Sequence, residues 1–173
     1  MRAWRTFHAA SETHRWETTG TYLITDIVTD DDLLSIAQEI ARSKLAKGTA
    51  LTDKHLAIHA LQGLLQSRER EVFAVLFLDN QHRILAYEEL FLGSLAAASV
   101  HPREVVKRAL HHNAAAVLLT HNHPSGLAEP SQADVEITQL LQEALKLVEV
   151  RLLDHVVVSA EGFVSLAEKG LLV

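Results

Sequence analysis

Two histidines and one aspartate occur at a spacing that can hold a metal ion. His121 and His123 are separated by one residue where a predicted strand ends, so both side chains point to one side of the chain, with Cα atoms about 6.5 Å apart. Asp134 lies in the first turn of the next predicted helix, on its apolar face. Ligands of the type His, His and Asp leave a fourth zinc position for water, which is typical of catalytic sites.

Each part of this pattern also has a simpler interpretation. A His-x-His pair is often no more than two hydrogen-bonded loop or edge histidines. Ser131 is the predicted N-cap of the helix, and Asp134 could complete a capping box by reaching back to the Ser131 amide. Aspartate is short for that role, and an inward carboxylate needs a partner, so we expect the cap to be only part of the explanation.

The elements that position these residues alternate between strands and helices. Residues 71–78 form an unbroken apolar run, which predicts a strand covered on both faces and central in the sheet. Strands alternating with helices, together with one hairpin, predict an α/β fold with a mixed sheet and helices on both faces. The predicted helices are 31–47, 53–65, 102–112 and one beginning near 131; the predicted strands are 71–78, 83–91, 114–120 and, as the last, 151–158.

Composition limits what these residues can do. The chain has 173 residues, 48% of them hydrophobic, which suits one globular domain. It contains no cysteine, so a metal site must be built from imidazole and carboxylate groups. A formal net charge of −6 provides no general attraction to nucleic acid, and we expect no strong nucleic-acid binding. Without an apolar membrane span or a secretory signal, a cytoplasmic protein is expected, with residues 1–20 as a mobile N-terminal arm.

A longer motif surrounds the candidate ligands. His121-Asn122-His123-Pro124, followed after six residues by Ser131 and after two more by Asp134, resembles the JAMM metalloprotease motif at every defined position. Three segments are similar to the RadC branch of that superfamily: HNHPSGLAEPSQAD, the preceding HPREVVKRAL and the following RLLDHVVVS. The resemblance suggests a RadC-like JAB/MPN domain over residues 51–173, preceded by an N-terminal helical segment over residues 21–50.

The resemblance implies a single α/β/α domain with a deaminase-like JAB/MPN core that hydrolyses a peptide or isopeptide bond. In such proteins the residues matching His121, His123 and Asp134 bind zinc, and the residue matching Ser131 stabilises the oxyanion. An upstream glutamate before an apolar strand is the general acid/base, and Glu71, in the wording Glu-Val-Phe, is our candidate. Glu69 is the rival, and both could instead belong to a solvated turn.

The remaining histidines are expected to be structural. His55 and His59, on helix 53–65, should lie on the surface. His111 and His112 should cap the end of helix 102–112, and the strand residue His155 should pair with a neighbour. The role of the Asp154-His155 pair is left open. The alternative function is a non-catalytic DNA-repair accessory or interaction module. The helix-hairpin-helix module of longer RadC proteins is not expected here, which weakens that link to DNA.

Overall fold

The computed structural model describes residues 28–93 and 100–172, so the predicted arm over residues 1–20 lies outside the described residues. The chain divides into two compact units, Met1–Ile36 and Ala37–Val173. Helix α1 (Asp30–Lys44) begins in the first unit, where the Asp32 carboxylate accepts hydrogen bonds from the Thr29 amide and hydroxyl. None of the described helices is both long and apolar enough to cross a lipid bilayer. The candidate site lies in the second unit.

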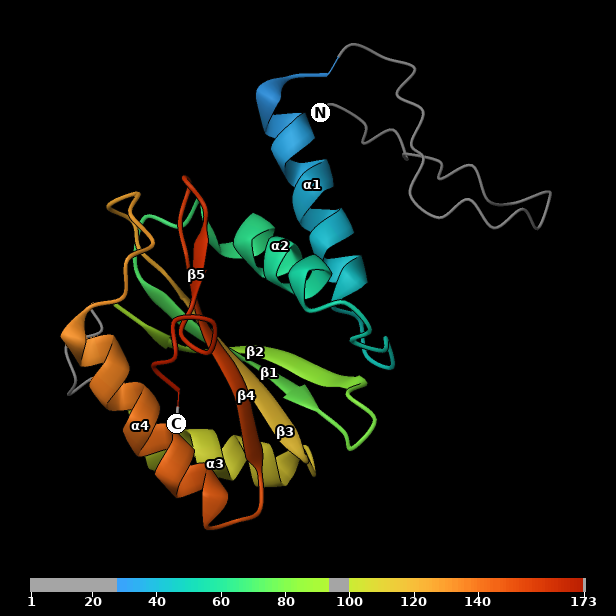
Figure 1. The fold of residues 1–173 in the computed structure, drawn as a ribbon. Helices are drawn as coiled ribbons and strands as arrows, with labels where there is room; N and C mark the ends of the chain where they lie inside the picture. The colour runs from blue at the N-terminus through green and yellow to red at the C-terminus, as the bar shows by residue number, and fades with distance from the viewer. Residues whose placement is uncertain (1–27, 94–99, 173) are drawn as a thin grey trace, which may run out of the picture. The chain divides into compact units, whose positions relative to one another are not determined.

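A five-stranded sheet forms the centre of the second unit, in the order β2-β1-β3-β4-β5 (Figure 1). Strands β3 and β4 are parallel and the other pairs are antiparallel, which confirms the predicted mixed sheet. All seven residues of β1 are buried between β2 and β3, as expected for a strand covered on both faces. The strands are β1 (Val72–Leu78), β2 (Ile84–Leu92), β3 (Ala116–Asn122), β4 (Arg151–Val158) and β5 (Phe163–Ser165).

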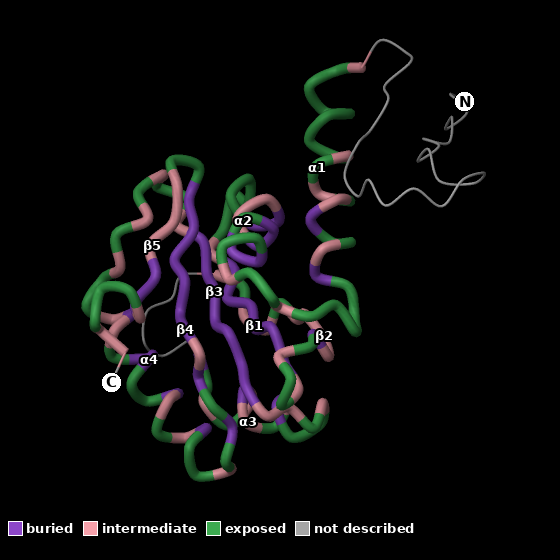
Figure 2. Tube along the Cα trace, turned by 45° about the vertical axis from the view of Figure 1, so that its right-hand side comes forward, coloured by how far each residue is buried: buried purple, intermediate pink, exposed green. Residues whose placement is uncertain are grey.

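Helices cover the two faces of this sheet with separate apolar cores. Helix α2 (Lys54–Leu65) packs on one face against Ala74 and Leu76 of β1. Helices α3 (Pro102–His111) and α4 (Gln132–Lys146) pack on the other face, against the alternate β1 residues Phe73 and Val75. Figure 2 shows the buried residues concentrated in the central strands. Because strand side chains alternate between faces, one strand contributes to both cores and the α/β/α layers follow.

Two predictions about the strands were wrong. The sheet does not end at β4, because β5 pairs with Val156–Val158 in antiparallel fashion. A three-residue strand is too short to show a hydrophobic period in the sequence. Strand β3 also runs two residues further than predicted, through His121 and Asn122, because both of its neighbours continue to pair with it there. His121 is therefore held inside the sheet rather than in a loop.

Asp154 is a buried carboxylate that ties several elements together. Its Oδ2 accepts hydrogen bonds from Lys54 Nζ at 2.8 Å and Ser165 Oγ at 2.6 Å. Its Oδ1 accepts from the amides of His155 at 2.7 Å and Ala167 at 3.0 Å. The first turn of α2, strand β4 and strand β5 with the turn after it are thus fixed to one side chain. This clamp explains one member of the Asp154-His155 pair in structural terms.

Removal of this carboxylate should destabilise the fold. Asp154→Ala leaves several buried donors without an acceptor, and we expect a loss of about 3 kcal/mol in the free energy of unfolding. Urea unfolding followed by circular dichroism measures the loss. The matched control is Glu168→Ala, since Glu168 binds the same Lys54 Nζ at 3.0 Å but is 52% exposed. That variant should stay within about 0.5 kcal/mol of the parent, and equal losses in both would rule out the clamp.

Candidate metal centre

Potential ligand atoms of three side chains converge at the end of β3. His121 Nε2 lies 3.0 Å from His123 Nε2 and 3.2 Å from Asp134 Oδ1, and His123 Nε2 lies 3.5 Å from Asp134 Oδ2. A tetrahedral ion with bonds of about 2.0–2.1 Å has ligand atoms about 3.3 Å apart, close to these separations. In the described part of the chain this is the one group of three or more metal-binding side chains. The group could hold a metal ion.

Different elements supply the three side chains. His121 is the second-last residue of β3 and is buried, and His123 follows directly after the strand ends. Asp134 lies in the first turn of α4, which begins at the end of the loop that follows β3 (Figure 1). The side chains of His121 and Asp134 are 0% and 3% exposed, whereas that of His123 is 15% exposed. The solvent-facing side of the group is therefore the His123 side.

The hydrogen bond of His123 indicates which of its ring nitrogens carries the proton. Nδ1 lies 3.0 Å from the main-chain oxygen of Leu127, and a carbonyl oxygen can only accept. Nδ1 therefore carries the hydrogen, and in the neutral ring Nε2 has a free lone pair directed at His121 and Asp134. Lone pairs directed at one point repel each other unless a proton or a metal cation lies between them. The donor set thus fits a bound cation.

The electrostatics of the group also favour metal binding. Burial lowers the pKa of His121, which keeps its imidazole neutral and able to donate a lone pair. The hydrogen bond with Asp134 raises the pKa of His123. Burial opposes ionisation of Asp134, but its interactions with the two histidines outweigh burial and hold the pKa of the carboxyl well below its usual value. The aspartate is therefore available as an anionic ligand.

Asp134 also forms the capping box that the sequence allowed as an alternative. Ser131 Oγ accepts a hydrogen bond from the Asp134 amide at 3.2 Å, and Asp134 Oδ2 accepts from the Ser131 amide at 2.7 Å. The Ser131 hydroxyl lies 2.6 Å from the same Oδ2, while Oδ1 faces His121. The two interpretations of Asp134 therefore hold together. Oδ2 of this carboxylate caps α4 and also lies 3.5 Å from His123 Nε2, while Oδ1 lies 3.2 Å from His121 Nε2.

Glu71 lies next to this group. Phe73 of β1 pairs with His121 of β3, and Glu71 lies two residues before Phe73, directly before β1 begins. Burial lowers the pKa of His121 and the hydrogen bond with Asp134 raises that of His123, and in both cases the negative charge of Glu71 adds a smaller upward contribution. Glu71 is half-buried, whereas the rival Glu69 is exposed. Of the two glutamates, the structure brings Glu71 to the candidate ligands.

Asn122, between the two histidines, positions the segment that carries Glu71. Its Oδ1 accepts a hydrogen bond from the Val72 amide at 2.7 Å. Its Nδ2 donates to the main-chain oxygens of Arg68 at 3.3 Å and Arg70 at 3.1 Å. The sequence analysis missed this residue. The alternation of side chains along a strand already places Asn122 on the face opposite His121, but its partners lie about 50 residues away in the chain.

Comparison with known proteins identifies the domain. A family profile described as "RadC-like JAB domain" matches residues 51–171. The chain belongs to the RadC-like JAB family. It is 57% identical over 138 residues to a UPF0758 protein of Cellvibrio japonicus and 56% identical over 138 residues to one of Vibrio cholerae. A UPF0758 protein of Methylibium petroleiphilum is 58% identical over 143 residues.

These matches cover only part of the relatives. Each aligned segment covers 80% of this chain, but 62% of the Cellvibrio and Vibrio proteins and 64% of the Methylibium protein. The chain therefore spans less than two thirds of the length of the curated relatives it matches. The family assignment applies to the RadC-like JAB domain, and the activity of the whole relatives is a separate question.

The other histidines of the RadC-like JAB domain make no ring contact or ring hydrogen bond with a candidate ligand, with one exception. His55 and His59 are exposed on α2, as predicted, with ring centroids 6.1 and 5.6 Å from that of Phe163. The His112 amide closes the end of α3, but its Nε2 lies 2.7 Å from Glu88 Oε1 of β2, a pairing that the sequence analysis did not anticipate. The exception is His155, which is fully buried against His121.

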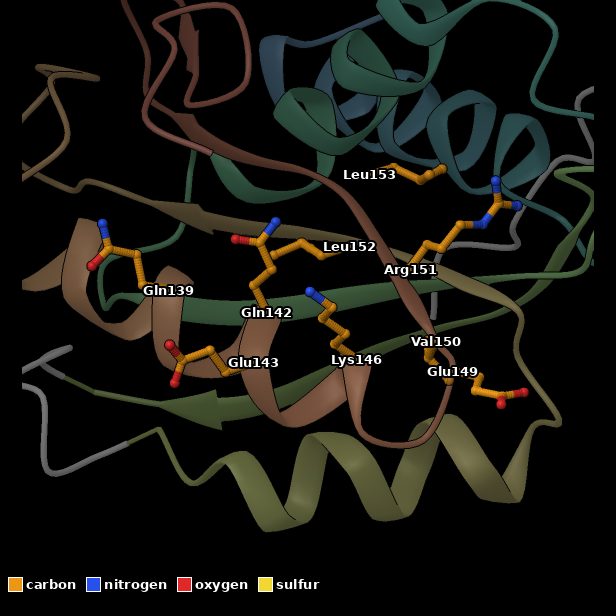
Figure 3. A pocket seen from close by; sticks show the side chains of 9 residues that line it. All are labelled: Gln139, Gln142, Glu143, Lys146, Glu149, Val150, Arg151, Leu152 and Leu153. Carbon is orange, nitrogen blue, oxygen red and sulfur yellow. The ribbon is translucent and has the colours of Figure 1, made fainter. Parts of the chain in front are cut away.

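Two pockets of the RadC-like JAB domain are lined by described residues. The larger, of about 810 Å³, lies between α4 and β4, where polar side chains such as Gln142 and Lys146 face Arg151 and Leu152 (Figure 3). None of the candidate ligands lines it. The smaller, of about 280 Å³, is lined in part by Leu127, whose main-chain oxygen is the partner of His123. Of these two pockets, the smaller is the one next to the candidate metal group.

Loss of any one ligand should sharply reduce metal binding. Alanine at His121, His123 or Asp134 leaves two ligand atoms, and we expect the metal content of the purified protein, measured by atomic emission, to fall far below one ion per chain. His55→Ala is the matched control and should retain the parent's content. A triple variant that still binds as the parent does would place the site elsewhere, and the pair His55 and His59 would be tested next.

Metal affinity should also depend on pH in a defined direction. Metal binding requires neutral imidazoles, and the pKa of metal-free His123 lies above its usual 6.5. Apparent affinity should be constant at alkaline pH and fall about tenfold per pH unit below that raised pKa, since one proton competes for the site. Asp134 stays ionised throughout because its pKa is lowered. Competition with a chelator across pH measures the profile, and an affinity independent of pH would contradict it.

Proposed function

We propose that this chain is a zinc-dependent metallohydrolase that cleaves a peptide or isopeptide bond. The observation that carries the proposal is the convergence of His121 Nε2, His123 Nε2 and an oxygen of Asp134 at one end of β3. Two nitrogens and one oxygen are a donor set that suits zinc and leaves a coordination position for a water molecule. When bound, zinc supplies Lewis-acid chemistry, lowering the pKa of water toward about 7 and polarising a carbonyl group.

Glu71 is the proposed general acid/base. Hydrolysis of an amide needs a carboxylate that takes a proton from the attacking water and returns it to the leaving nitrogen. Glu71 is supported in this role by its half-buried position, its effect on the pKa of both histidines, and the hold of Asn122 on the adjacent chain. A carboxylate held beside the ligands needs little reorganisation before it acts.

Ser131 is the proposed donor to the developing oxyanion. Its hydroxyl donates to Asp134 Oδ2 in this structure while Oγ caps α4. Rotation about the Cβ–Oγ bond would turn the hydrogen away from Asp134 toward a substrate oxygen and leave the cap intact. The same side chain can therefore serve the helix end and the reaction.

The proposed substrate is a peptide or protein segment. Its side chain could occupy the smaller pocket beside Leu127, where apolar Phe163 and Val164 lie with acidic Glu129 and Glu161. The net charge of −6 disfavours binding to nucleic acid. We propose a cytoplasmic location. A non-catalytic DNA-repair accessory is the alternative. Salt-dependent binding to duplex DNA distinguishes the two, because tight binding at physiological ionic strength would favour the accessory.

The direct test is cleavage of peptide and isopeptide libraries by the zinc-loaded protein. We expect products that disappear when a chelator removes the metal and return when zinc is restored. If no library yields zinc-dependent products although zinc is bound, the non-catalytic alternative becomes the better one.

Replacement of Glu71 should separate proton transfer from metal binding. Glu71→Gln keeps the side-chain shape and touches no ligand, so zinc content should be unchanged while turnover falls by about 10² to 10⁴. Glu69→Gln is the matched control on the exposed side of the same turn and should stay within a small factor of the parent. If the effects of the two variants are exchanged, Glu69 is the base. If both remain fully active, the base lies elsewhere.

Replacement of Ser131 should affect both stability and turnover. Ser131→Ala removes the cap and should cost about 1 kcal/mol in the free energy of unfolding. It should also lower turnover by about 10² if the hydroxyl donates to the oxyanion. Ser131→Thr keeps the hydroxyl and should retain most of the stability and most of the turnover. A destabilised but fully active alanine variant would leave Ser131 only the cap.

A further inference from the structure

His155 is a fully buried histidine that the proposed reaction does not use. It lies on β4, parallel to β3, with Nε2 2.8 Å from His121 Nδ1. That nitrogen is on the opposite side of the His121 ring from Nε2, which faces Asp134. The other ring nitrogen of His155, Nδ1, lies 2.5 Å from Thr138 Oγ1. His155 therefore connects a candidate ligand to helix α4 behind the metal group.

The direction of these hydrogen bonds can be worked out from the Thr138 end. The Thr138 hydroxyl lies 2.5 Å from the main-chain oxygen of Asp134, which can only accept, so the single hydroxyl hydrogen is used there. Thr138 Oγ1 must then accept from His155, whose Nδ1 carries the hydrogen. His155 is fully buried and its ring nitrogens face His121 and Thr138, with no carboxylate hydrogen-bonded to them, which favours the neutral ring, so its Nε2 is an acceptor.

The last step reaches the candidate ligand. Because His155 Nε2 accepts, the hydrogen between the two rings belongs to His121 Nδ1. The neutral His121 ring then has its free lone pair on Nε2, the nitrogen 3.2 Å from Asp134 Oδ1. The geometry points to His155 as a positioning residue, an inference that rests on the metal site of the proposed function. With Thr138, His155 fixes the tautomer and ring orientation in which His121 binds the metal ion.

Packing around the relay supports this role. Phe73 is buried with its ring stacked on that of His121 at 6.4 Å and edge-on to that of His155 at 5.5 Å. An apolar cover keeps water from competing for the two ring nitrogens and strengthens their hydrogen bond. Thr138 is one helical turn after Asp134, so α4 supplies both a candidate ligand and the end of the relay. A group that accepts the second ring hydrogen of a metal-binding histidine typically raises metal affinity by about 10–100-fold.

Zinc affinity, measured by chelator competition, is the first test. His155→Leu removes the acceptor and should weaken zinc binding by about 10–100-fold. His155→Gln can place an amide oxygen near the former Nε2 and should recover part of that loss. Val156→Ala is the matched control, because this buried β4 neighbour belongs to the core on the α2 face, away from the relay. Its zinc affinity should equal that of the parent.

Thr138 provides a second pair of variants in case leucine at position 155 prevents folding. Thr138→Val removes the acceptor for His155 at nearly constant shape, whereas Thr138→Ser keeps a hydroxyl. We expect weaker zinc binding in the valine variant and parental binding in the serine variant. If both bind as the parent does, Thr138 does not fix the tautomer and the inference fails.

Nitrogen-15 NMR of the histidine rings in metal-free protein reports the tautomer itself. His121 should carry its hydrogen on Nδ1 in the parent and lose this preference in His155→Leu, or in Thr138→Val if the leucine variant does not fold. Hydrogen on Nε2 of His121 in the parent would overturn the relay. A parent that binds no zinc would overturn the proposed function and this inference together. A parent that binds zinc no more tightly than His155→Leu would overturn the inference alone.

Discussion

The imidazole nitrogens of His121 and His123 and the carboxylate oxygens of Asp134 lie 3.0–3.5 Å apart. The rest of the structure depends on this convergence. Their lone pairs repel one another at 3.0–3.5 Å unless a proton or a metal cation lies between them, and burial removes the water that would otherwise screen this repulsion. The fold must therefore hold each side chain against a force that separates them. Each is fixed by a contact of its own, through strand pairing, a main-chain carbonyl or a helix cap.

The end of β3 and the start of α4 together hold the candidate ligands in place. β3 is paired on both sides up to His121, so the backbone of the first ligand cannot shift without breaking two ladders. Asp134 sits in the first turn of α4, where the partial positive charge of the helix end favours a carboxylate. Its Oδ2 caps the helix and faces His123, and its Oδ1 faces His121. The start of the helix and the geometry of the site are thus set by one side chain.

Neighbouring residues on β4 serve opposite faces of the sheet. Asp154 faces α2 and binds Lys54, while His155 faces α4 and contacts His121. The alternation of side chains along a strand makes this division possible. Asp154 also accepts the His155 amide, so the structural clamp fixes the backbone from which the histidine reaches the site. Stability of the β4–β5 edge and orientation of the candidate ligand are therefore coupled through adjacent residues.

The sequence by itself determined the ligand types, their common side and the α/β class. These follow from local geometry: a two-residue strand period directs His121 and His123 together, and helical spacing turns Asp134 inward. Tertiary structure decided which of Glu69 and Glu71 lies beside the ligands, the role of Asn122, the fifth strand and the contact between His121 and His155. Those depend on strand register and on pairs of residues tens of positions apart. A pattern confined to one segment carries no record of such pairs, since only folding brings the segments together.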